Sequence, residues 1–327
     1  MESTAPIVSV IVATRDRPAT LPDTLRSIAS QTFEDFEVIV VDDGSSEKTL
    51  AQYAAIFSGL DDRFRVERPP APTPWGSGPG VARNRGIHAA RGRYLAFCDD
   101  DDVWIRDDHL AVAVAALDKT GAEFFFASQR SEKAGEVVEP MWFNTHDAMI
   151  REPQVMDDPP VHRVRLEATL SELRFPHLNI CVMRREFVVE LGGFWERLRY
   201  LEDWDLTFRI FDRARLSLYR PENVALHNVP TQKGSASRAV SDLERYQITV
   251  LAAQHLRIHC SNPYLRKIAG EWEAMYQWRI ARWVMEDGRP DAALKIIAQA
   301  ALAMPSLRWA PFAGKALTAT VKKRFRG

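Results

Sequence analysis

The chain has 327 residues, enough for one large domain with an appendage or for two domains. Its 43 Lys and Arg residues nearly balance 44 Asp and Glu residues, and the formal net charge of −1 argues against nucleic acid as a partner. The three cysteines, Cys98, Cys181 and Cys260, are scattered without a C-x-x-C pair. This spacing argues against a disulfide framework or a zinc site and fits a reducing cytosol.

Targeting and membrane-spanning patterns are not found in the sequence. The first residues form no basic leader, and the apolar run that follows is too short and too rich in β-branched residues for a signal peptide. No window approaches the roughly 18 consecutive apolar residues that a spanning helix needs. We therefore expect the protein in the cytoplasm.

The first third of the chain alternates strand and helix patterns. Apolar runs rich in β-branched and aromatic residues predict strands at 7–14, 36–43, 63–67 and 93–100. Segments with helical spacing lie between them, at 21–32, 46–57 and 81–90. Such alternation predicts a doubly wound α/β sheet that binds ligands at the carboxyl ends of its strands.

The rest of the chain is less regular. We expect a helix that ends at Gly121 and a strand at 122–130, whereas residues 154–164, with prolines and charges, are interpreted as a mobile loop. From Ser237 to about Met304 successive amphipathic segments predict helices. The predicted organisation is a catalytic domain at 1–236 followed by a helical C-terminal extension at 237–327.

Four adjacent carboxylates, Asp99 to Asp102, follow the apolar run Tyr94 to Cys98. Adjacent carboxylates repel one another, and burying them is costly unless cations or hydrogen-bond donors compensate. An acidic surface turn is the simpler interpretation of such a run. The apolar residues on both sides instead indicate the end of a buried strand, where a cationic partner is expected.

Three segments together resemble the family 2 glycosyltransferases of GT-A fold: VSVIVATRDRPATLPDTLRSIASQTFEDFEVIVVDDGS, GVARNRGIHAARGRYLAFCDDDDVW and GGFWERLRYLEDWDLTFRI. The resemblance runs from about Ile7 to His227 and does not include the helical C-terminus. It implies a Rossmann-like, doubly wound mixed sheet. It also implies transfer of a sugar from a nucleotide-diphosphate donor to an acceptor hydroxyl, with inversion at the anomeric carbon.

The acidic run suits that reaction because a departing diphosphate accumulates negative charge. Mg²⁺ or Mn²⁺ neutralises such charge and prefers carboxylate oxygen ligands. The resemblance implies that Asp101 is a direct metal ligand, that Asp99 faces the donor ribose, that Asp100 occupies the variable middle position on the donor side, and that Asp102 supports the turn. His227 matches a histidine that completes the metal shell or contacts the diphosphate, although a purely structural role is an alternative.

The resemblance also implies a pocket for the nucleotide. At the end of the second strand, Asp43 would accept the imide N–H of uracil, with Asp42 as its support, so UDP is the expected donor nucleotide. Thr14 and Arg15 end the first strand, where the family contacts the nucleotide. Arg83 would project into the same crevice, with a surface salt bridge as the alternative.

An inverting reaction needs a base for the acceptor hydroxyl. The resemblance implies that Asp203 is this base, with Glu202 beside it and Trp204 as a platform for the acceptor, while Asp205 is expected to cap the following helix. Asn179 is a further candidate for acceptor contact.

The sequence therefore predicts a metal-dependent inverting glycosyltransferase of cell-surface polysaccharide synthesis, with a glycan or a lipid-linked saccharide as acceptor. A non-catalytic carbohydrate-binding or scaffold subunit is one alternative, and the retained carboxylates Asp43, Asp101 and Asp203 argue against it. A sugar nucleotidyltransferase is another. It would need a glycine-rich basic loop after the first strand, where the sequence is TRDRPATLP.

The last segment, Ser306–Gly327, combines apolar residues with a cluster of Lys and Arg. As a helix it would place the apolar residues along one side and the cations toward anionic lipid headgroups. Peripheral contact with the inner face of the membrane is one hypothesis for this tail. A solvated basic tail that keeps the last helix soluble is the other.

Overall fold

The computed structural model describes residues 5–69, 76–143, 150–164, 169, 175–229, 241–304 and 310–324. Contacts divide the chain into two compact units. The first comprises residues 1–197 and 213–232, and the second comprises residues 198–212 and 233–327.

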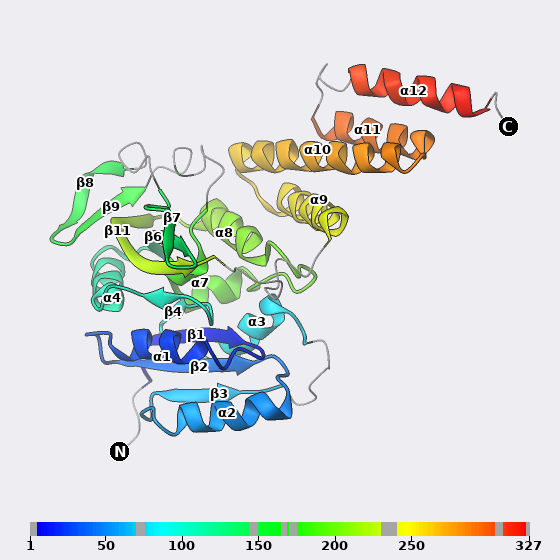
Figure 1. The fold of residues 1–327 in the computed structure, drawn as a ribbon. Coiled ribbons are helices and arrows are strands. Elements are labelled where there is room, and N and C mark those ends of the chain that lie inside the picture. Colours follow the sequence, from blue (N-terminus) through cyan, green and yellow to red (C-terminus); the bar gives the residue numbers. More distant parts are fainter. Residues whose placement is uncertain are drawn as a thin grey trace. The chain divides into compact units, whose positions relative to one another are not determined.

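The first unit is built on a mixed β-sheet (Figure 1). Within the described residues its strands follow the order β3-β2-β1-β4-β10-β6-β11-β9-β8, with β5 paired to β11 and β7 paired to β6. The strands are β1 (Val8–Thr14), β2 (Phe36–Asp42), β3 (Phe64–Glu67), β4 (Tyr94–Phe97), β5 (Val103–Trp104), β6 (Phe124–Lys133), β7 (Glu136–Glu139), β8 (Ile150–Asp157), β9 (Pro160–Val164), β10 (Cys181–Arg184) and β11 (Ser217–Asn228). Strands β3, β2, β1 and β4 pair in parallel, while β10 is antiparallel to β4 and to β6. The doubly wound mixed sheet predicted from the sequence is confirmed.

The helices of this unit lie in the connections between strands, and the sequence predicts all of those named here except the last. They are α1 (Leu21–Ala29), α2 (Glu47–Phe57), α3 (Pro79–Ala89), α4 (His109–Thr120) and α7 (Arg185–Glu190). Helix α1 buries Leu21, Leu25 and Ile28 completely, because residues spaced by three and four share one helix face. Helix α4 ends at Gly121, which adopts a left-handed conformation with φ of 70° that glycine reaches without strain.

The prediction of a loop at 154–164 is wrong. These residues contribute to β8 and β9, an antiparallel pair in which Met156 lies opposite Val161. Strand β9 also pairs with β11, where Tyr219 lies opposite His162. The local sequence suggests a loop because prolines and charges obscure the alternation, whereas the pairing partner β11 lies far along the chain. A proline at the first residue of a strand, such as Pro160, is compatible with the ladder.

The second unit is helical. It contains α8 (Glu202–Arg213), α9 (Asp242–His259), α10 (Pro263–Glu286), α11 (Pro290–Ala303) and α12 (Ala310–Arg324), and consecutive members from α9 to α12 pack on one another. Helix α8 is grouped with them because Trp204 stacks on Trp272, with ring centroids 4.6 Å apart, and Asp205 hydrogen-bonds His255. This grouping differs from the boundary expected at residue 236.

Helix α12 covers part of the second unit's apolar core. Phe312 and Ala313 pack against a cluster formed by Ala281, Val284, Ala293 and Ile297. The predicted lipid-facing side is therefore partly used for packing within the protein. Leu317 and Val321 remain 54% and 45% exposed. Trp309 and Phe325 lie outside the described residues, as do the side chains of Lys322, Lys323 and Arg324.

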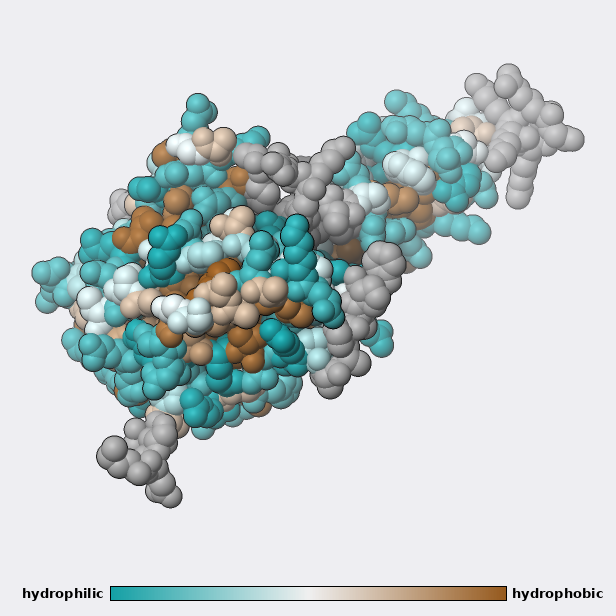
Figure 2. Space-filling model, turned by 60° about the horizontal axis from the view of Figure 1, so that its bottom comes forward, coloured by the Kyte–Doolittle hydropathy of each residue, from teal (hydrophilic) through white to brown (hydrophobic). Residues whose placement is uncertain are grey.

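Large apolar side chains are mostly buried in the described residues. The face in Figure 2 is mostly hydrophilic, with hydrophobic residues in limited groups. No helix in the described segments is both long enough and apolar enough to span a lipid bilayer.

Candidate active site

The carboxyl ends of β1, β2 and β4 meet at one edge of the sheet. Because these strands are parallel, Thr14 at the end of β1 lies opposite Asp42 at the end of β2. The backbone N–H of Asp43 donates to the carbonyl of Thr14 at 2.9 Å. The acidic run begins two residues after β4, which pairs with β1 through Phe97 and Ile11. The structure thus brings together Thr14, Asp43 and the acidic run.

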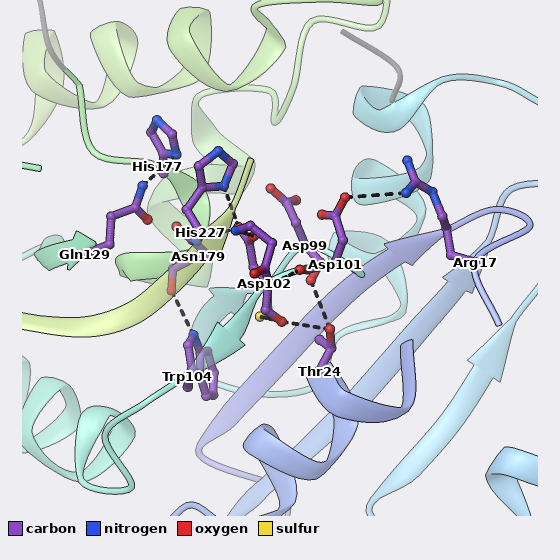
Figure 3. Close-up of polar contacts among 12 residues, drawn as sticks. Arg17, Thr24, Asp99, Asp101, Asp102, Trp104, Gln129, His177, Asn179 and His227 are labelled. Carbon is purple, nitrogen blue, oxygen red and sulfur yellow. Dashed lines mark hydrogen bonds and ion pairs between the residues drawn. The ribbon is translucent and has the colours of Figure 1, made fainter. Parts of the chain in front are cut away.

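Asp102 is the buried anchor of the acidic run. Its side chain is fully buried and accepts hydrogen bonds from Asn179 Nδ2 at 2.8 Å and from the backbone N–H of Asn228 at 2.7 Å. His227 Nδ1 lies 3.0 Å from the same carboxylate (Figure 3). The backbone carbonyl of Asp102 accepts a hydrogen bond from the Thr24 hydroxyl at 2.7 Å. These contacts come from α1, η1 (Leu178–Ile180) and β11 and hold the turn in place.

The other three carboxylates contact different partners. Asp99 accepts from Arg83 Nη2 at 2.7 Å. Asp100 accepts from the Thr14 hydroxyl at 2.7 Å. Asp101 lies 3.5 Å from Arg17 Nη1, and both side chains keep solvent access, at 21% and 30% exposure respectively. Asp101 is therefore less tightly engaged than its neighbours.

Burial and mutual repulsion perturb these carboxyl groups. Burial raises the pKa of Asp100 to about 7, although the Thr14 hydrogen bond opposes the shift. Burial and the charge of Asp99 likewise raise the pKa of Asp101, with Arg17 acting in the opposite direction. Burial also disfavours ionisation of Asp99, but Arg83 outweighs it and holds the pKa of Asp99 below its usual value. Carboxyl groups perturbed in this way, in one cluster, are typical of a functional site.

The residues present suit a divalent cation. His227 carries the proton on Nδ1 when it donates to Asp102, which leaves the Nε2 lone pair for a metal; metal-binding histidines usually have such a carboxylate partner. Burial disfavours the charged imidazole, yet the hydrogen bond to Asp102 outweighs it and raises the pKa of His227. Within the described segments no three His, Cys, Asp or Glu side chains converge into a complete metal cage.

The Asp43 carboxylate is held by the start of α3. It accepts the backbone N–H groups of Ser77 and Gly78 at 2.8–2.9 Å, and it is 7% exposed. Gly76 lies against Asp43 and Arg15, because a Cβ at this glycine would come within 2.7 Å of both side chains. The geometry therefore gathers Asp43 and Arg15 around one loop, next to Thr14 on the neighbouring strand.

Helix α3 connects the acidic run to the GGFWE segment. Arg83 contacts Asp99 and lies over the Phe194 ring at 5.6 Å. Its neighbour Asn84 donates to the Phe194 carbonyl at 2.9 Å and accepts from the Phe194 N–H at 2.8 Å. A side chain at Gly193, whose φ is 65°, would approach Asn84 Oδ1 to 2.5 Å, so glycine is required there. The alternative of a surface salt bridge for Arg83 does not hold, because its side chain is only 11% exposed.

Two predicted acceptor contacts do not agree with the structure. Asn179 is fully buried and donates to Asp102, so it positions the acidic run. Trp204 is 1% exposed, stacks on Trp272 and packs against Phe208 at a tilt, so its ring is not open to a sugar. Glu202 is 6% exposed, and Asp203 accepts the N–H of Trp204 at 2.8 Å, both in the second unit. Asp205 binds Arg209 and His255 instead of capping the helix.

Several residues of the site are not identified by sequence reasoning. Arg17 contacts Asp101, and Asn228 donates from its side chain to the Asp101 carbonyl at 2.6 Å. The sequence carries weak signals for both, since Arg17 lies in TRDRP and Asn228 follows His227. Thr24 and His177 carry no local signal, because their partners lie more than 45 residues away.

Comparison with known proteins identifies the relatives of this chain. The family model described as Glycosyl transferase family 2 matches residues 9–192. A PGL/p-HBAD biosynthesis glycosyltransferase of Mycobacterium tuberculosis (strain ATCC 25177 / H37Ra) is 32% identical over 248 residues, which is 73% of this chain and 82% of that protein. A glycosyltransferase of Haemophilus influenzae is 24% identical over 268 residues, covering 78% of this chain and 82% of that one.

Solved structures share the fold. Residues 1–349 of S. aureus TarS, in complex with UDP-GlcNAc, match with a TM-score of 0.67 at 20% identity, over 91% of this chain and 82% of that chain. The mannosyltransferase PcManGT from Pyrobaculum calidifontis, in complex with GDP-Man and Mn²⁺, matches with a TM-score of 0.60 at 20% identity. The match covers 99% of this chain and 83% of that chain. These likenesses confirm the GT-A fold with a helical C-terminal region.

Proposed function

The chain belongs to glycosyl transferase family 2, and we propose from this premise that it is a metal-dependent, inverting enzyme that moves a sugar from a UDP-sugar to a hydroxyl of a glycan or lipid-linked saccharide. Glycosyl transfer follows from the family. The observation that supports a metal-dependent reaction is the run Asp99 to Asp102. Its carboxylates outnumber the cations in contact with them in the described part of the chain.

Asp101 and His227 would hold the metal, with Asp102 fixing the His227 tautomer. Mn²⁺ or Mg²⁺, when bound, neutralises the charge that develops on the departing diphosphate. Among the side-chain carboxylate contacts described for the acidic run, that of Asp101 is the longest, 3.5 Å to Arg17 Nη1, so its carboxylate is the least tightly held and the most available to a cation. The Mn²⁺ bound by PcManGT also supports it.

The donor nucleotide would lie over the ends of β1 and β2. The Asp43 carboxylate offers about four acceptor positions. It can therefore accept a hydrogen bond from the uracil imide in addition to those from the Ser77 and Gly78 N–H groups. Arg15 and Arg83 would face the diphosphate, and Asp99 the ribose. Thr14 and Asp100, bonded to each other, would shape the pocket floor. The neighbours differ, since TarS is in complex with UDP-GlcNAc and PcManGT with GDP-Man, and we favour UDP because the Asp43 carboxylate suits the uracil imide.

Asp203 would act as the base. Its carboxylate takes the proton of the acceptor hydroxyl while that oxygen attacks the anomeric carbon. The bond between this carbon and the diphosphate breaks, and the diphosphate leaves with the bonding electrons. Attack opposite the leaving group inverts the anomeric configuration.

The acceptor would be a saccharide carried by a larger glycan or by a lipid at the inner membrane surface. The mycobacterial relative is named for PGL/p-HBAD biosynthesis, and Leu317 and Val321 leave apolar surface on α12. Sedimentation with anionic vesicles tests the membrane contact. Binding should fall at high salt and on deletion of residues 306–327. Equal binding by the truncated protein would remove the tail from the proposal.

A thermal-shift panel of UDP, GDP and dTDP, each with and without Mn²⁺, tests the donor and the metal together. We expect UDP to stabilise the protein most and Mn²⁺ to increase the shift, because a ligand bound only by the folded state raises Tm. In Asp101→Ala the Mn²⁺-dependent increase should disappear. Stabilisation by no nucleotide would contradict the proposal, and would favour the non-catalytic subunit if the protein bound glycan alone.

A further inference from the structure

The buried ring of Phe194 contacts both the end of β4 and the guanidinium of Arg83. Phe97, the last residue of β4, meets this ring edge to face, with the two centroids 5.6 Å apart. Arg83 Cζ lies over the same ring, and Arg83 Nη2 donates to Asp99 at 2.7 Å. Phe194 is 2% exposed, so its contact with Arg83 lies largely out of water. Exclusion of water strengthens the attraction between a guanidinium and an aromatic face.

Asn84 fixes the backbone that carries this ring. Both polar atoms of its side-chain amide are used, since Nδ2 donates to the Phe194 carbonyl at 2.9 Å and Oδ1 accepts the Phe194 N–H at 2.8 Å. Nδ2 also lies 3.0 Å from Glu196 Oε1. Asn84 is itself 7% exposed, and a Cβ at Gly193 would come within 2.5 Å of its Oδ1. Phe194 therefore cannot shift without breaking these contacts.

Helix α3 carries both the cation and the group that secures the ring, because Arg83 and Asn84 are consecutive residues. A Cβ at Gly86 of the same helix would come within 2.5 Å of the Ile11 side chain in β1, so α3 packs closely on the sheet. An arginine side chain loses much rotamer freedom when it is held in one geometry. The buried Phe194 ring imposes part of that restriction before any ligand binds, which lowers the entropic cost of binding.

We propose that Phe194, secured by Asn84, is a positioning residue that holds the Arg83 guanidinium toward the diphosphate of the donor, a proposal that rests on the function proposed above. With five N–H donors in a rigid plane, a guanidinium can contact a carboxylate and a phosphate oxygen together. An aromatic face attracts the guanidinium without using these N–H groups. Phe194 thereby contributes to donor affinity through Arg83, without contacting the nucleotide.

Binding of UDP and of uridine to the full chain, measured by calorimetry at a fixed Mn²⁺ concentration, tests this role. Uridine lacks the diphosphate, so the loss of a group that acts through Arg83 should leave uridine affinity unchanged. Phe194→Leu removes the aromatic face but keeps an apolar side chain, and it should weaken UDP binding about three- to tenfold. Asn84→Asp cannot donate to the Phe194 carbonyl, so it should also weaken the binding of UDP and not that of uridine.

A double-mutant cycle shows whether Phe194 acts through Arg83. Arg83→Gln should weaken UDP binding by itself. Adding Phe194→Leu to it should produce no further loss, because the ring no longer has a guanidinium to hold. Unchanged UDP binding in Arg83→Gln, or a further loss in the double variant equal to that in Phe194→Leu alone, would overturn the positioning role.

Phe36→Leu is the matched control. The Phe36 ring also lies under an arginine, with Arg63 Cζ 4.4 Å from the ring centroid, but Phe36 begins β2 and lies at the opposite end of that strand from Asp42. This variant should lose stability and bind UDP like wild type.

Two results with the variants at Phe194 would overturn the proposal: unchanged UDP affinity, or an equal fall in UDP and uridine affinity, which would show a role in the fold alone. Phe194→Met serves the same comparison should Phe194→Leu fail to fold. Failure of wild type to bind UDP would instead contradict the proposed function.

Discussion

Buried carboxylates occur in both units, but their charge is compensated differently. In the helical unit two of the three buried carboxylates in the described residues have an arginine partner: Asp205 pairs with Arg209, and Glu273 pairs with Arg257. Glu273 also accepts hydrogen bonds from the side chains of two glutamines. These groups satisfy one another and leave little unbalanced charge, which is typical of a structural role.

At the strand ends of the first unit, three of four consecutive carboxylates are in contact with Arg17, Arg83 or His227, and the fourth, Asp100, accepts from the Thr14 hydroxyl. Here burial and repulsion raise the pKa of Asp100 and Asp101, so part of the negative charge is not compensated by the protein. This difference teaches that a buried carboxylate alone does not identify a functional site. We propose that an excess of negative charge over the neighbouring cations and hydrogen-bond donors marks the functional site, and the following substitutions test that distinction.

The largest effect is expected for Asp203→Asn. The substitution keeps the shape of the side chain but removes its ability to take a proton, so transfer should fall by about 10²- to 10⁴-fold. UDP release in the presence of an acceptor preparation that supports wild-type turnover measures it, and UDP affinity should not change. Asp212→Asn on the same helix is the matched control: Asp212 binds the backbone of Ser261 and Asn262, so that variant should lose stability and keep its turnover. Near-normal turnover of Asp203→Asn would reject the assignment of the base.

Asp101→Ala should reduce transfer by about 10²- to 10³-fold, as expected when a group that stabilises developing charge is lost. Its thermal stability should stay the same or rise, because the substitution relieves repulsion with Asp99. Excess chelator should reproduce the loss of activity in wild type and have little effect on the variant. Full wild-type activity in chelator would show that no metal is needed.

Glu273→Gln tests a compensated carboxylate of the helical unit. The variant loses the charge that pairs with Arg257, and we expect the free energy of unfolding to fall by about 1–3 kcal/mol. Denaturant unfolding measures this change, while turnover and UDP affinity should remain those of wild type. A loss of turnover without a loss of stability would contradict the division between compensated and uncompensated carboxylates.

The smallest effect concerns acid stability. His109 is fully buried, its ring nitrogens have no hydrogen-bond partner in the described part of the chain, and burial lowers its pKa from 6.5 to about 3. Below pH 6.5 the unfolded chain binds a proton that the folded protein does not, so stability falls as the pH decreases from 6.5 toward 3. His109→Phe keeps a ring beside Trp104 but cannot titrate. Its Tm should therefore decrease less than that of wild type between pH 7 and pH 4.5, and parallel curves would contradict this reading.

Much of the candidate site was predictable because it lies where local sequence decides structure. Runs of β-branched residues predict β1 and β2, and the motif positions place Asp43 and Asp99 just beyond strand ends. Because these strands are parallel, their carboxyl ends lie at one edge of the sheet, which places Asp43 and Asp99 near each other. The position of Arg83 beside this edge follows in the same way, since α3 begins in the adjoining loop and Arg83 contacts Asp99.

The errors occur where distant segments meet. Trp204 resembles an exposed platform in the sequence, yet Trp272 in α10 covers it. Asn179 resembles an acceptor contact, yet it lies against Asp102, 77 residues earlier. Strands β8 and β9 were missed because β11 completes their sheet. Local sequence patterns cannot identify these partners, because the partners lie far away in the sequence.

The sequence by itself determined the doubly wound fold, the family and the position of the acidic run, because periodicity and motif spacing depend on neighbours along the chain. Only the tertiary structure decided which carboxylates are compensated and which residues surround His227. Charge compensation, burial and aromatic contact depend on side chains brought together from separate strands, as the contacts of Gln129 and His177 on one side and Asp102 on the other demonstrate.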